Sequence, residues 1–464
     1  MPRSENTPLQ TRRTFLQNAS LLAAALPLAK LDGFAAAAGS STAASPTLPT
    51  NLPETLVSDP RVKLTFGPER MVMPDGLQPS MLCTSSGTLI VQSQLSGKPH
   101  PQERIFYPYA LKTVVSRDGG EQWAESPLKP GDNGVDLEGG IIQLRDGTII
   151  ALETYVTAGD GPGKGAGLLY HSTDDWRTVQ GPVDITLTLP GVNFAASTDD
   201  RGRPHAAMRL HRRILELPNG DLITTMLGWF EGDTEPSGYT PGLKKSRVVF
   251  LRSTNRGRHW DMISTVAAGT LGTEGFSEPV LVRITRGPRA GRLICQMRTG
   301  RDLHESISDD EGRSWSLAHP RVYANIDVYR TDLWIEMFRD VKRKGKPLVE
   351  NPNEIIGAVV DPELLELRSG VLVAAFGVRI PARGCWTNPK HPWNGNYMAF
   401  SLNQGDTWSH VVRMTSGIFT THYMAVEEMP KDNHLFVVYD FGHWTCQEGR
   451  YTYGRPLTIS ASPI

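Results

Sequence analysis

The sequence predicts an all-β protein built as a six-bladed β-propeller. Three observations support this: a strand unit recurs six times, a Trp-containing loop recurs beside it, and Gly and Pro are abundant. The chain has 45 Gly and 34 Pro among 464 residues, which favours many turns and short strands over long helices. Length alone would suggest two or three domains, but a repeat fold can run this long as one domain.

The N-terminal segment has the pattern of an export signal. The sequence Thr11-Arg-Arg-Thr-Phe-Leu-Gln17 precedes an apolar run, Leu21 to Ala29, and the Ala-rich stretch Ala35 to Ala38. A basic pair, a short apolar run and small residues, in this order, are typical of a twin-arginine signal peptide. The alternative is an Arg pair before a buried helix. We expect a signal peptide over 1–38 and a mature protein that is periplasmic or secreted.

The rest of the chain divides into a leader and the propeller. Residues 39–60 are rich in Ser, Thr, Pro and Ala, and we expect a flexible leader there. We expect the propeller over 61–464, with a strand near Val62 to Phe66 pairing with the last blade, which would remove an exposed edge. Within the propeller, residues 156–171 are rich in Gly and are expected to form a flexible loop.

Six copies of a strand–turn–strand unit define the blades. In each copy an apolar strand is followed by a turn and a second apolar strand. The second strands begin at Gly87, Gly147, Gly220, Gly291, Gly370 and Asn433. Six four-stranded blades around one axis are the economical interpretation of this repetition.

A loop motif, Ser-x-Asp/Asn-x-Gly-x-x-Trp, accompanies these units. Its copies are Ser116 to Trp123, Ser253 to Trp260, Ser308 to Trp315 and Ser401 to Trp408, with a decayed copy at Ser172 to Trp176. The Asp or Asn side chain can bond backbone amides within the loop. Gly supplies a positive φ, and Trp can pack beneath the hairpin.

This motif on a six-bladed propeller resembles the sialidase (neuraminidase) superfamily, in which it is called the Asp-box or BNR repeat. The resemblance covers roughly residues 60–460. It implies that the boxes lie opposite the active face, and it implies carbohydrate chemistry only by analogy of fold. Residues just before each first strand or just after each second strand should then line the active mouth. They are Gln78, Asp136, Glu138, Arg209, His211, Glu278, Asp361, Glu363, His422 and Tyr423, and Gln94, Glu153, Tyr155, Trp229, Arg298, Arg379 and Asp440.

Three of these residues match landmarks of the family. The stretch from Glu278 to Arg298 resembles the blade with the catalytic Glu and a carboxylate-binding Arg, and Tyr423 resembles the tyrosine nucleophile of the final blade. The resemblance implies that Glu278 takes the phenol proton and that Tyr423 attacks the anomeric carbon, giving a covalent glycosyl-enzyme. The alternatives are a solvated carboxylate, an ion-paired arginine and a core tyrosine.

The general acid has no unique counterpart in the sequence. The family's acid is an Asp on an early-blade loop, and Asp136 and Glu138 are the best candidates by position. Their alternative is a surface turn.

Further basic residues are expected to bind an acidic sugar. Arg379 is equivalent to Arg298 by blade position and could supply a second arginine of a carboxylate clamp. Arg209, His211 and His422 are the other expected substrate-binding residues, and the alternative for the basic segment around 199–213 is a solvated loop.

The first blade departs from the family. Sialidases carry a clamp arginine there, whereas this chain has Gln78 before Pro79. Arg209 or Arg212 could substitute for it. Because a guanidinium holds a carboxylate through two parallel hydrogen bonds, its loss weakens a strict sialic-acid assignment. The sequence therefore predicts a sialidase-like, retaining exo-glycoside hydrolase that removes a terminal, acidic sugar.

Two other functions remain open. One is a lyase or rhamnosidase acting on uronate-containing polysaccharide, with His205, His211 or His422 as the critical group. The other is a non-catalytic propeller that binds glycans or proteins.

Composition and spacing argue against other partners. Lys plus Arg number 48 and Asp plus Glu 49, which argues against nucleic acid. No segment of the expected mature chain is long and apolar enough to cross a membrane. No spacing resembles a zinc site or a phosphate-binding loop, and no Cys pair forms CxxC. We therefore expect a carbohydrate partner and neither a metal nor a cofactor.

Overall fold

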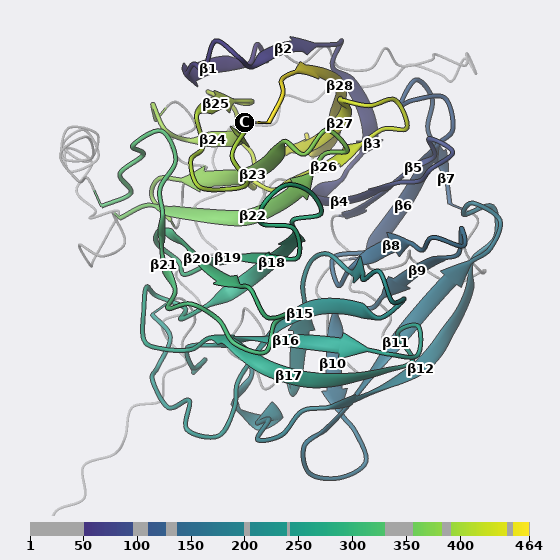
Figure 1. Cartoon of the computed structure of the whole chain (residues 1–464), viewed down its shortest axis with the longest axis vertical. Helices are drawn as coiled ribbons and strands as arrows, with labels where there is room; N and C mark the ends of the chain where they lie inside the picture. The colour runs from purple at the N-terminus through teal and green to yellow at the C-terminus, as the bar shows by residue number, and fades with distance from the viewer. Residues whose placement is uncertain are drawn as a thin grey trace, which may run out of the picture. The chain divides into compact units, whose positions relative to one another are not determined.

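The computed structural model describes residues 51–95, 110–126, 137–198, 205–238, 242–329, 356–382, 391–442 and 449–463. The expected signal peptide, most of the expected leader and Asp136 lie outside these residues. Their strands form six blades around a common centre (Figure 1), and the chain passes from blade to blade in sequence order. The predicted all-β, six-bladed fold is therefore confirmed.

The first three blades contain the following strands. Blade 1 comprises β4 (Leu77–Cys83), β5 (Leu89–Gln94), β6 (Leu111–Ser116) and β7 (Ala124–Glu125). Blade 2 comprises β8 (Ile141–Gln143), β9 (Ile149–Leu152), β11 (Lys164–Ser172) and β12 (Gln180–Thr188), with β10 (Tyr155–Ala158) beside β11. Blade 3 comprises β13 (Ala207–Leu210), β14 (Leu215–Glu216), β15 (Leu222–Gly228), β16 (Arg247–Ser253) and β17 (His259–Ala267). A 3₁₀ turn (Phe194–Ala196) lies between blades 2 and 3.

The last three blades follow the same plan. Blade 4 comprises β18 (Ser277–Arg283), β19 (Leu293–Arg298), β20 (Leu303–Ser308) and β21 (His319–Arg321). Blade 5 comprises β22 (Ala358–Glu366), β23 (Leu372–Arg379), β24 (Gly395–Ser401) and β25 (His410–Arg413), with β1 (Glu54–Val57) at its edge. Blade 6 comprises β26 (Met424–Glu428), β27 (His434–Phe441) and β28 (Tyr451–Ser460), with β2 (Lys63–Phe66) and β3 (Arg70–Pro74) beside β28. The first strand of each blade faces the centre, where β18 contacts β22, β22 contacts β26, and β26 contacts β4.

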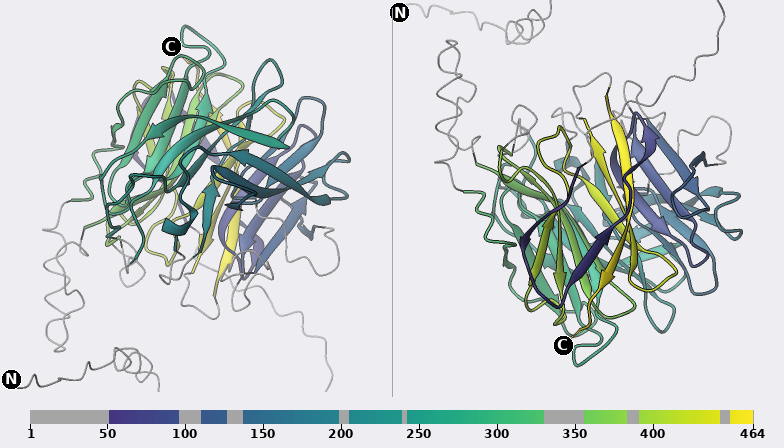
Figure 2. Two further views of the ribbon diagram at one scale, coloured as in Figure 1. Left: turned by 90° about the horizontal axis from the view of Figure 1, so that it is seen from below. Right: turned by 90° about the horizontal axis from the view of Figure 1, so that it is seen from above.

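The N-terminal strands close the ring. Strand β2 pairs antiparallel with β28, with Lys63 opposite Ser460 and Phe66 opposite Leu457, and Figure 2 shows the purple strand beside the yellow one. This confirms the expected closure and removes an exposed edge. The end of the segment expected to be a flexible leader is instead ordered as strand β1, which pairs with β25 of blade 5.

Blades 2 and 3 share one continuous sheet. Their outer strands β12 and β17 run parallel, with Thr186 opposite His259. The Gly-rich segment expected to be a loop is part of blade 2, where Ala158 pairs with Gly165 of β11. A Cβ at Gly165 would lie 2.8 Å from Val156 Cγ1, so glycine here allows close packing rather than flexibility.

The recurring Ser-x-Asp/Asn-x-Gly-x-x-Trp loops have the hydrogen bonds expected from their sequence. In the loop that begins at Ser116, Asp118 Oδ1 accepts hydrogen bonds from the amides of Glu121 and Gln122, both at 3.0 Å. The Ser116 hydroxyl accepts a hydrogen bond from the amide of Gly120 at 2.9 Å. Equivalent Ser-to-Gly bonds occur in the loops that begin at residues 253, 308 and 401.

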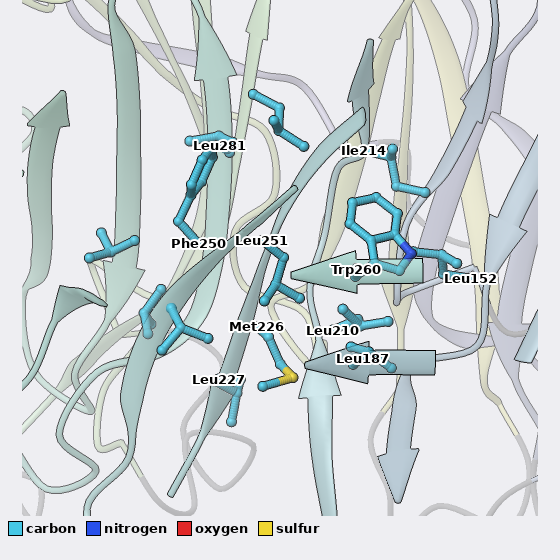
Figure 3. Close-up of a cluster of buried hydrophobic side chains, with 14 of the residues drawn as sticks. Leu152, Leu187, Leu210, Ile214, Met226, Leu227, Phe250, Leu251, Trp260 and Leu281 are labelled. Atoms are coloured by element: carbon cyan, nitrogen blue, oxygen red, sulfur yellow. The ribbon is translucent and has the colours of Figure 1, made fainter. Parts of the chain in front are cut away.

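A large apolar core among the described residues lies in blades 2 and 3 and reaches into blade 4. Figure 3 shows Trp260, fully buried, among Leu152, Leu187 and Leu210. None of the helices in the described part of the chain is long and apolar enough to span a membrane.

Candidate active site

Four inner strands have a residue in the left-handed region of φ at or near their first residues. The φ values are 51° at Gln78, 39° at Glu278, 53° at Asp361 and 67° at His422. In the first three, proline follows and the strand pairing shifts register at that point, as in a β-bulge. Such backbone costs about 1–3 kcal/mol per residue and tends to be kept at functional sites. The repeated bulges mark the strand ends at which the sequence placed the active mouth.

The centre of the site is a contact between blades 4 and 6. The Tyr423 hydroxyl donates a hydrogen bond to Glu278 Oε1. Arg298 Nη1 donates to the same carboxylate oxygen at 2.6 Å and to the Tyr423 hydroxyl oxygen at 3.3 Å. The structure thus brings together the three residues that resemble family landmarks, although they are up to 145 positions apart.

Electrostatics keep Glu278 ionised and Tyr423 neutral in the resting site. Burial opposes the charge on Glu278, but the Arg298 guanidinium and the Tyr423 hydroxyl lower the pKa of this carboxyl to about 2. Burial and the Glu278 charge raise the pKa of the Tyr423 phenol well above its ordinary value. The site therefore holds a proton acceptor directly beside a protonated phenol.

Asp361, at the start of blade 5, forms hydrogen bonds that connect Glu278 with the backbone next to Tyr423. Its backbone amide donates to Glu278 Oε2 at 3.1 Å, and its carboxylate accepts from the backbone amide of Met424 at 3.0 Å. Arg212 forms ion pairs with Asp361 and, at 3.1 Å, with Glu363. Burial raises the pKa of Asp361 well above its ordinary value, while the Arg212 charge opposes this.

Glu138 and His211 meet on the neighbouring blades 2 and 3. His211 Nε2 lies 3.4 Å from Glu138 Oε1, and His211 Nδ1 lies 3.0 Å from the carbonyl oxygen of Pro279. Burial opposes the charge on Glu138, but the interaction with His211 holds the pKa of this carboxyl below its usual value.

The arginines expected to bind substrate are engaged with the protein. Arg298 Nη2 donates to Glu274 Oε1 at 2.7 Å, in addition to its bond with Glu278. Arg379 donates to the carbonyl oxygen of Thr421 through Nε at 3.1 Å and Nη2 at 2.6 Å. Its guanidinium carbon lies 5.3 Å from the centre of the Tyr423 ring. Two guanidinium groups therefore flank the phenol.

Several other predicted residues have partners in the described part of the chain. The Arg209 guanidinium lies 5.3 Å from the centre of the Tyr155 ring. His422 is buried, and burial together with the Arg379 charge holds its pKa well below the ordinary value, so its imidazole is neutral. The amide of Gln78 donates to Asp440 Oδ2 at 2.8 Å. Asp136 lies outside the described residues.

The structure gives two residues of the site, Arg212 and Glu274, roles that the sequence did not predict. Arg212 was considered as a substitute clamp arginine, but its ion pairs with Asp361 and Glu363 make it a supporting residue. Glu274 was not predicted at all. Its position three residues before the β18 strand was the available signal, because segments leading into inner strands supply the mouth. Within the described residues, no group of three or more His, Cys, Asp or Glu is arranged to hold a metal ion.

Comparisons with known proteins find solved structures that share this fold. No family model matches the chain, and no curated protein matches it. A protein of unknown function from Dyadobacter fermentans is 15% identical, with 86% of this chain and 100% of that chain covered and a TM-score of 0.54. It shares the propeller fold.

Weaker similarities include two carbohydrate-active enzymes. The NanB sialidase from Streptococcus pneumoniae is 12% identical, with 85% of this chain and 71% of that chain covered and a TM-score of 0.47. An α-L-arabinanase from Penicillium chrysogenum is 14% identical, with 88% and 98% covered and a TM-score of 0.47. At these values the function has to be argued from the site.

Proposed function

We propose that this protein is a retaining glycoside hydrolase of the sialidase type that removes a terminal acidic sugar. The observation that carries the proposal is the hydrogen bond from the Tyr423 hydroxyl to Glu278, with Arg298 in contact with both. A buried phenol beside an ionised carboxylate has the arrangement of an activated nucleophile and its base.

In this mechanism Glu278 accepts the phenol proton as Tyr423 attacks the anomeric carbon. The aglycone leaves, and the sugar stays covalently bound to the tyrosine oxygen. Because burial raises the pKa of the phenol, the proton should move only as the new carbon–oxygen bond forms. Water then attacks the anomeric carbon, Glu278 returns the proton to Tyr423, and the sugar is released with its configuration retained.

The choice of tyrosine favours an acidic sugar. A carboxylate nucleophile would be repelled by an anionic group near the anomeric carbon, whereas a neutral phenol approaches it without that repulsion. Arg298 and Arg379 place two positive charges beside the phenol, where they would attract an anionic substrate. Gln78 is neutral and stands where the family has a third arginine. The carboxylate should therefore be held by fewer paired hydrogen bonds than in a sialidase.

The proposal can be tested by trapping the covalent intermediate. The exported form would be incubated with fluorinated glycosyl fluorides of sialic acid and uronic acids, and the labelled peptide identified by mass spectrometry. We expect one adduct, on Tyr423, and its absence in Tyr423→Phe. The matched control is Tyr451→Phe, which removes a hydroxyl from β28 and should leave labelling intact.

Three results would contradict the proposal. An adduct on another residue would replace Tyr423 as nucleophile. Release of a sugar of inverted configuration, detected by NMR, would exclude a covalent intermediate. Binding of acidic glycans without turnover of any substrate would indicate a binding protein.

A further inference from the structure

We infer that Glu138 and His211 form the proton-donating pair of this site. Glu138 is the general acid that protonates the leaving group, and His211 is a positioning residue that holds and orients the shared proton. This inference rests on the proposed glycosidase function and assigns a role that the sequence left open between two acidic residues.

The hydrogen bonds of His211 determine where its protons lie. The Pro279 carbonyl oxygen can only accept, so Nδ1 at 3.0 Å must carry a hydrogen. Nε2 is buried and makes no aligned hydrogen bond within the described residues, and it faces Glu138 Oε1 at 3.4 Å. A proton placed between Nε2 and Oε1 would join these two atoms in a hydrogen bond, so the geometry allows the pair to share one exchangeable proton.

Exposure decides which member can reach a substrate. The His211 side chain is 2% exposed and that of Glu138 is 17% exposed. A proton held on the histidine can therefore reach the leaving group only through the carboxyl. The hydrogen bond from His211 to Pro279 fixes the imidazole plane behind Glu138, as in other pairs in which a second group orients a proton carrier.

The backbone brings the pair beside the nucleophile and its base. Pro279, which orients His211, directly follows Glu278 in β18. Gly140, two residues after Glu138, allows blades 2 and 3 to approach, since a Cβ there would lie 2.8 Å from Ile214 Cγ1 and 3.0 Å from the Arg212 carbonyl oxygen.

The proton balance of the two steps is complete. In the first, the aglycone C–O bond breaks as the Tyr423 C–O bond forms. Glu138 gives its proton to the leaving oxygen, and the phenol proton goes to Glu278. In the second, water gives a proton to Glu138 and its oxygen to the anomeric carbon. Tyr423 leaves and recovers its proton from Glu278.

The test compares substrates whose leaving groups differ in their need for a proton. For Glu138→Gln we expect kcat/KM to fall by roughly 10²–10⁴-fold with an alkyl or sugar aglycone, the range of general acid catalysis. With a dinitrophenyl aglycone, which leaves without protonation, the first step should be nearly unaffected. Added azide should restore turnover and give a glycosyl azide of retained configuration, because azide attacks without a base.

His211→Asn tests the positioning residue. Its side-chain amide can still donate to the Pro279 carbonyl but leaves no proton for Glu138. We expect a smaller loss with the same dependence on the leaving group, which a purely structural defect would not produce. The matched control is Glu231→Gln, which neutralises an exposed carboxylate. Thermal unfolding of each variant would show that the fold is retained.

Two results would overturn the inference. One is an equal loss in Glu138→Gln for all leaving groups, and the other is a leaving-group-dependent loss in Asp136→Asn instead. Trapping of the covalent intermediate on Tyr423 distinguishes a wrong general-acid assignment from a wrong proposed function. If the wild-type protein is labelled on Tyr423 but Glu138→Gln lacks the dependence, only the acid assignment fails. If no Tyr423 adduct forms, the glycosidase proposal itself fails.

Discussion

The Tyr423 hydroxyl of blade 6 donates a hydrogen bond to Glu278 of blade 4, and Arg298 contacts both. The two blades are separated in the ring by blade 5, whose Asp361 binds the backbone amide of Met424 and donates its own amide to Glu278. Three consecutive blades therefore hold the pair in place. The predictions below test this arrangement and the fold that supports it.

Glu278→Gln should remove the proton acceptor and leave the fold intact. We expect kcat/KM to fall by roughly 10²–10⁴-fold, the contribution of a general base. The pKa of Glu278 is lowered to about 2, so the wild-type residue is ionised throughout the ordinary pH range. The loss should therefore be similar at all pH values from about 4 to 8. A loss that disappears at high pH would contradict the assignment of Glu278 as base.

Asp361→Asn should weaken the support behind the catalytic pair. Asn tolerates a positive φ and can still accept from the Met424 amide, but it removes the charge that faces Arg212. We expect the free energy of unfolding to fall, because the buried Arg212 guanidinium loses one of its carboxylate partners. Urea unfolding would measure this, and kcat should fall more than KM rises.

A double-mutant cycle with Arg212→Met isolates the Asp361 interaction. If the ion pair causes the loss, the two substitutions should be much less than additive. Additive effects would show that Asp361 acts through another contact.

Glu427→Gln should stabilise the protein at alkaline pH relative to acidic pH. Burial raises the pKa of Glu427 to about 7, against the opposing charge of Arg213. At a pH below the ordinary carboxyl pKa, Glu427 is protonated in both the folded and the unfolded protein, so it does not lower the free energy of unfolding there. As pH rises to about 7 the unfolded state ionises first, and wild-type stability falls by up to ~3 kcal/mol. The difference in Tm between Glu427→Gln and wild type should be more favourable at pH 8 than at pH 4, and a constant difference would contradict this.

Gly312→Ala tests the packing of a recurring loop. Gly312 has φ 82°, and a Cβ there would lie 2.3 Å from Phe250 Cε1. Gly147→Ala is the matched control, because its φ is 88° and nothing lies within 4 Å of its Cβ. The control should cost about 1 kcal/mol for backbone strain, and Gly312→Ala should cost clearly more because the aromatic ring must move. Equal losses in thermal unfolding would show that the steric contact is relieved cheaply.

The export expectation is tested by the arginine pair. Changing both Arg12 and Arg13 to Lys should retain the precursor in the cytoplasm and abolish its cleavage, because the twin-arginine pathway reads that pair. Cell fractionation and N-terminal sequencing would measure this. A cleaved periplasmic protein from the variant would contradict the assignment.

Local sequence patterns predicted the architecture because each blade is a local unit. The turns at Gly87 and Gly291, for example, lie between strands that pair with each other. Conversely, the Gly-rich segment of blade 2 was interpreted as a flexible loop because its close contacts with Val156 and Leu189 involve strand packing that composition does not reveal.

The sequence by itself determined the fold class and predicted which strand ends and residues line the mouth, because blade repeats and turn chemistry are encoded within short segments. Only the tertiary structure decided which of these residues touch. Tyr423 of blade 6 meets Glu278 of blade 4, Arg212 forms an ion pair with Asp361, and His211 faces Glu138. These pairings depend on how neighbouring blades pack around the axis, and the period of the strands carries no information about that packing.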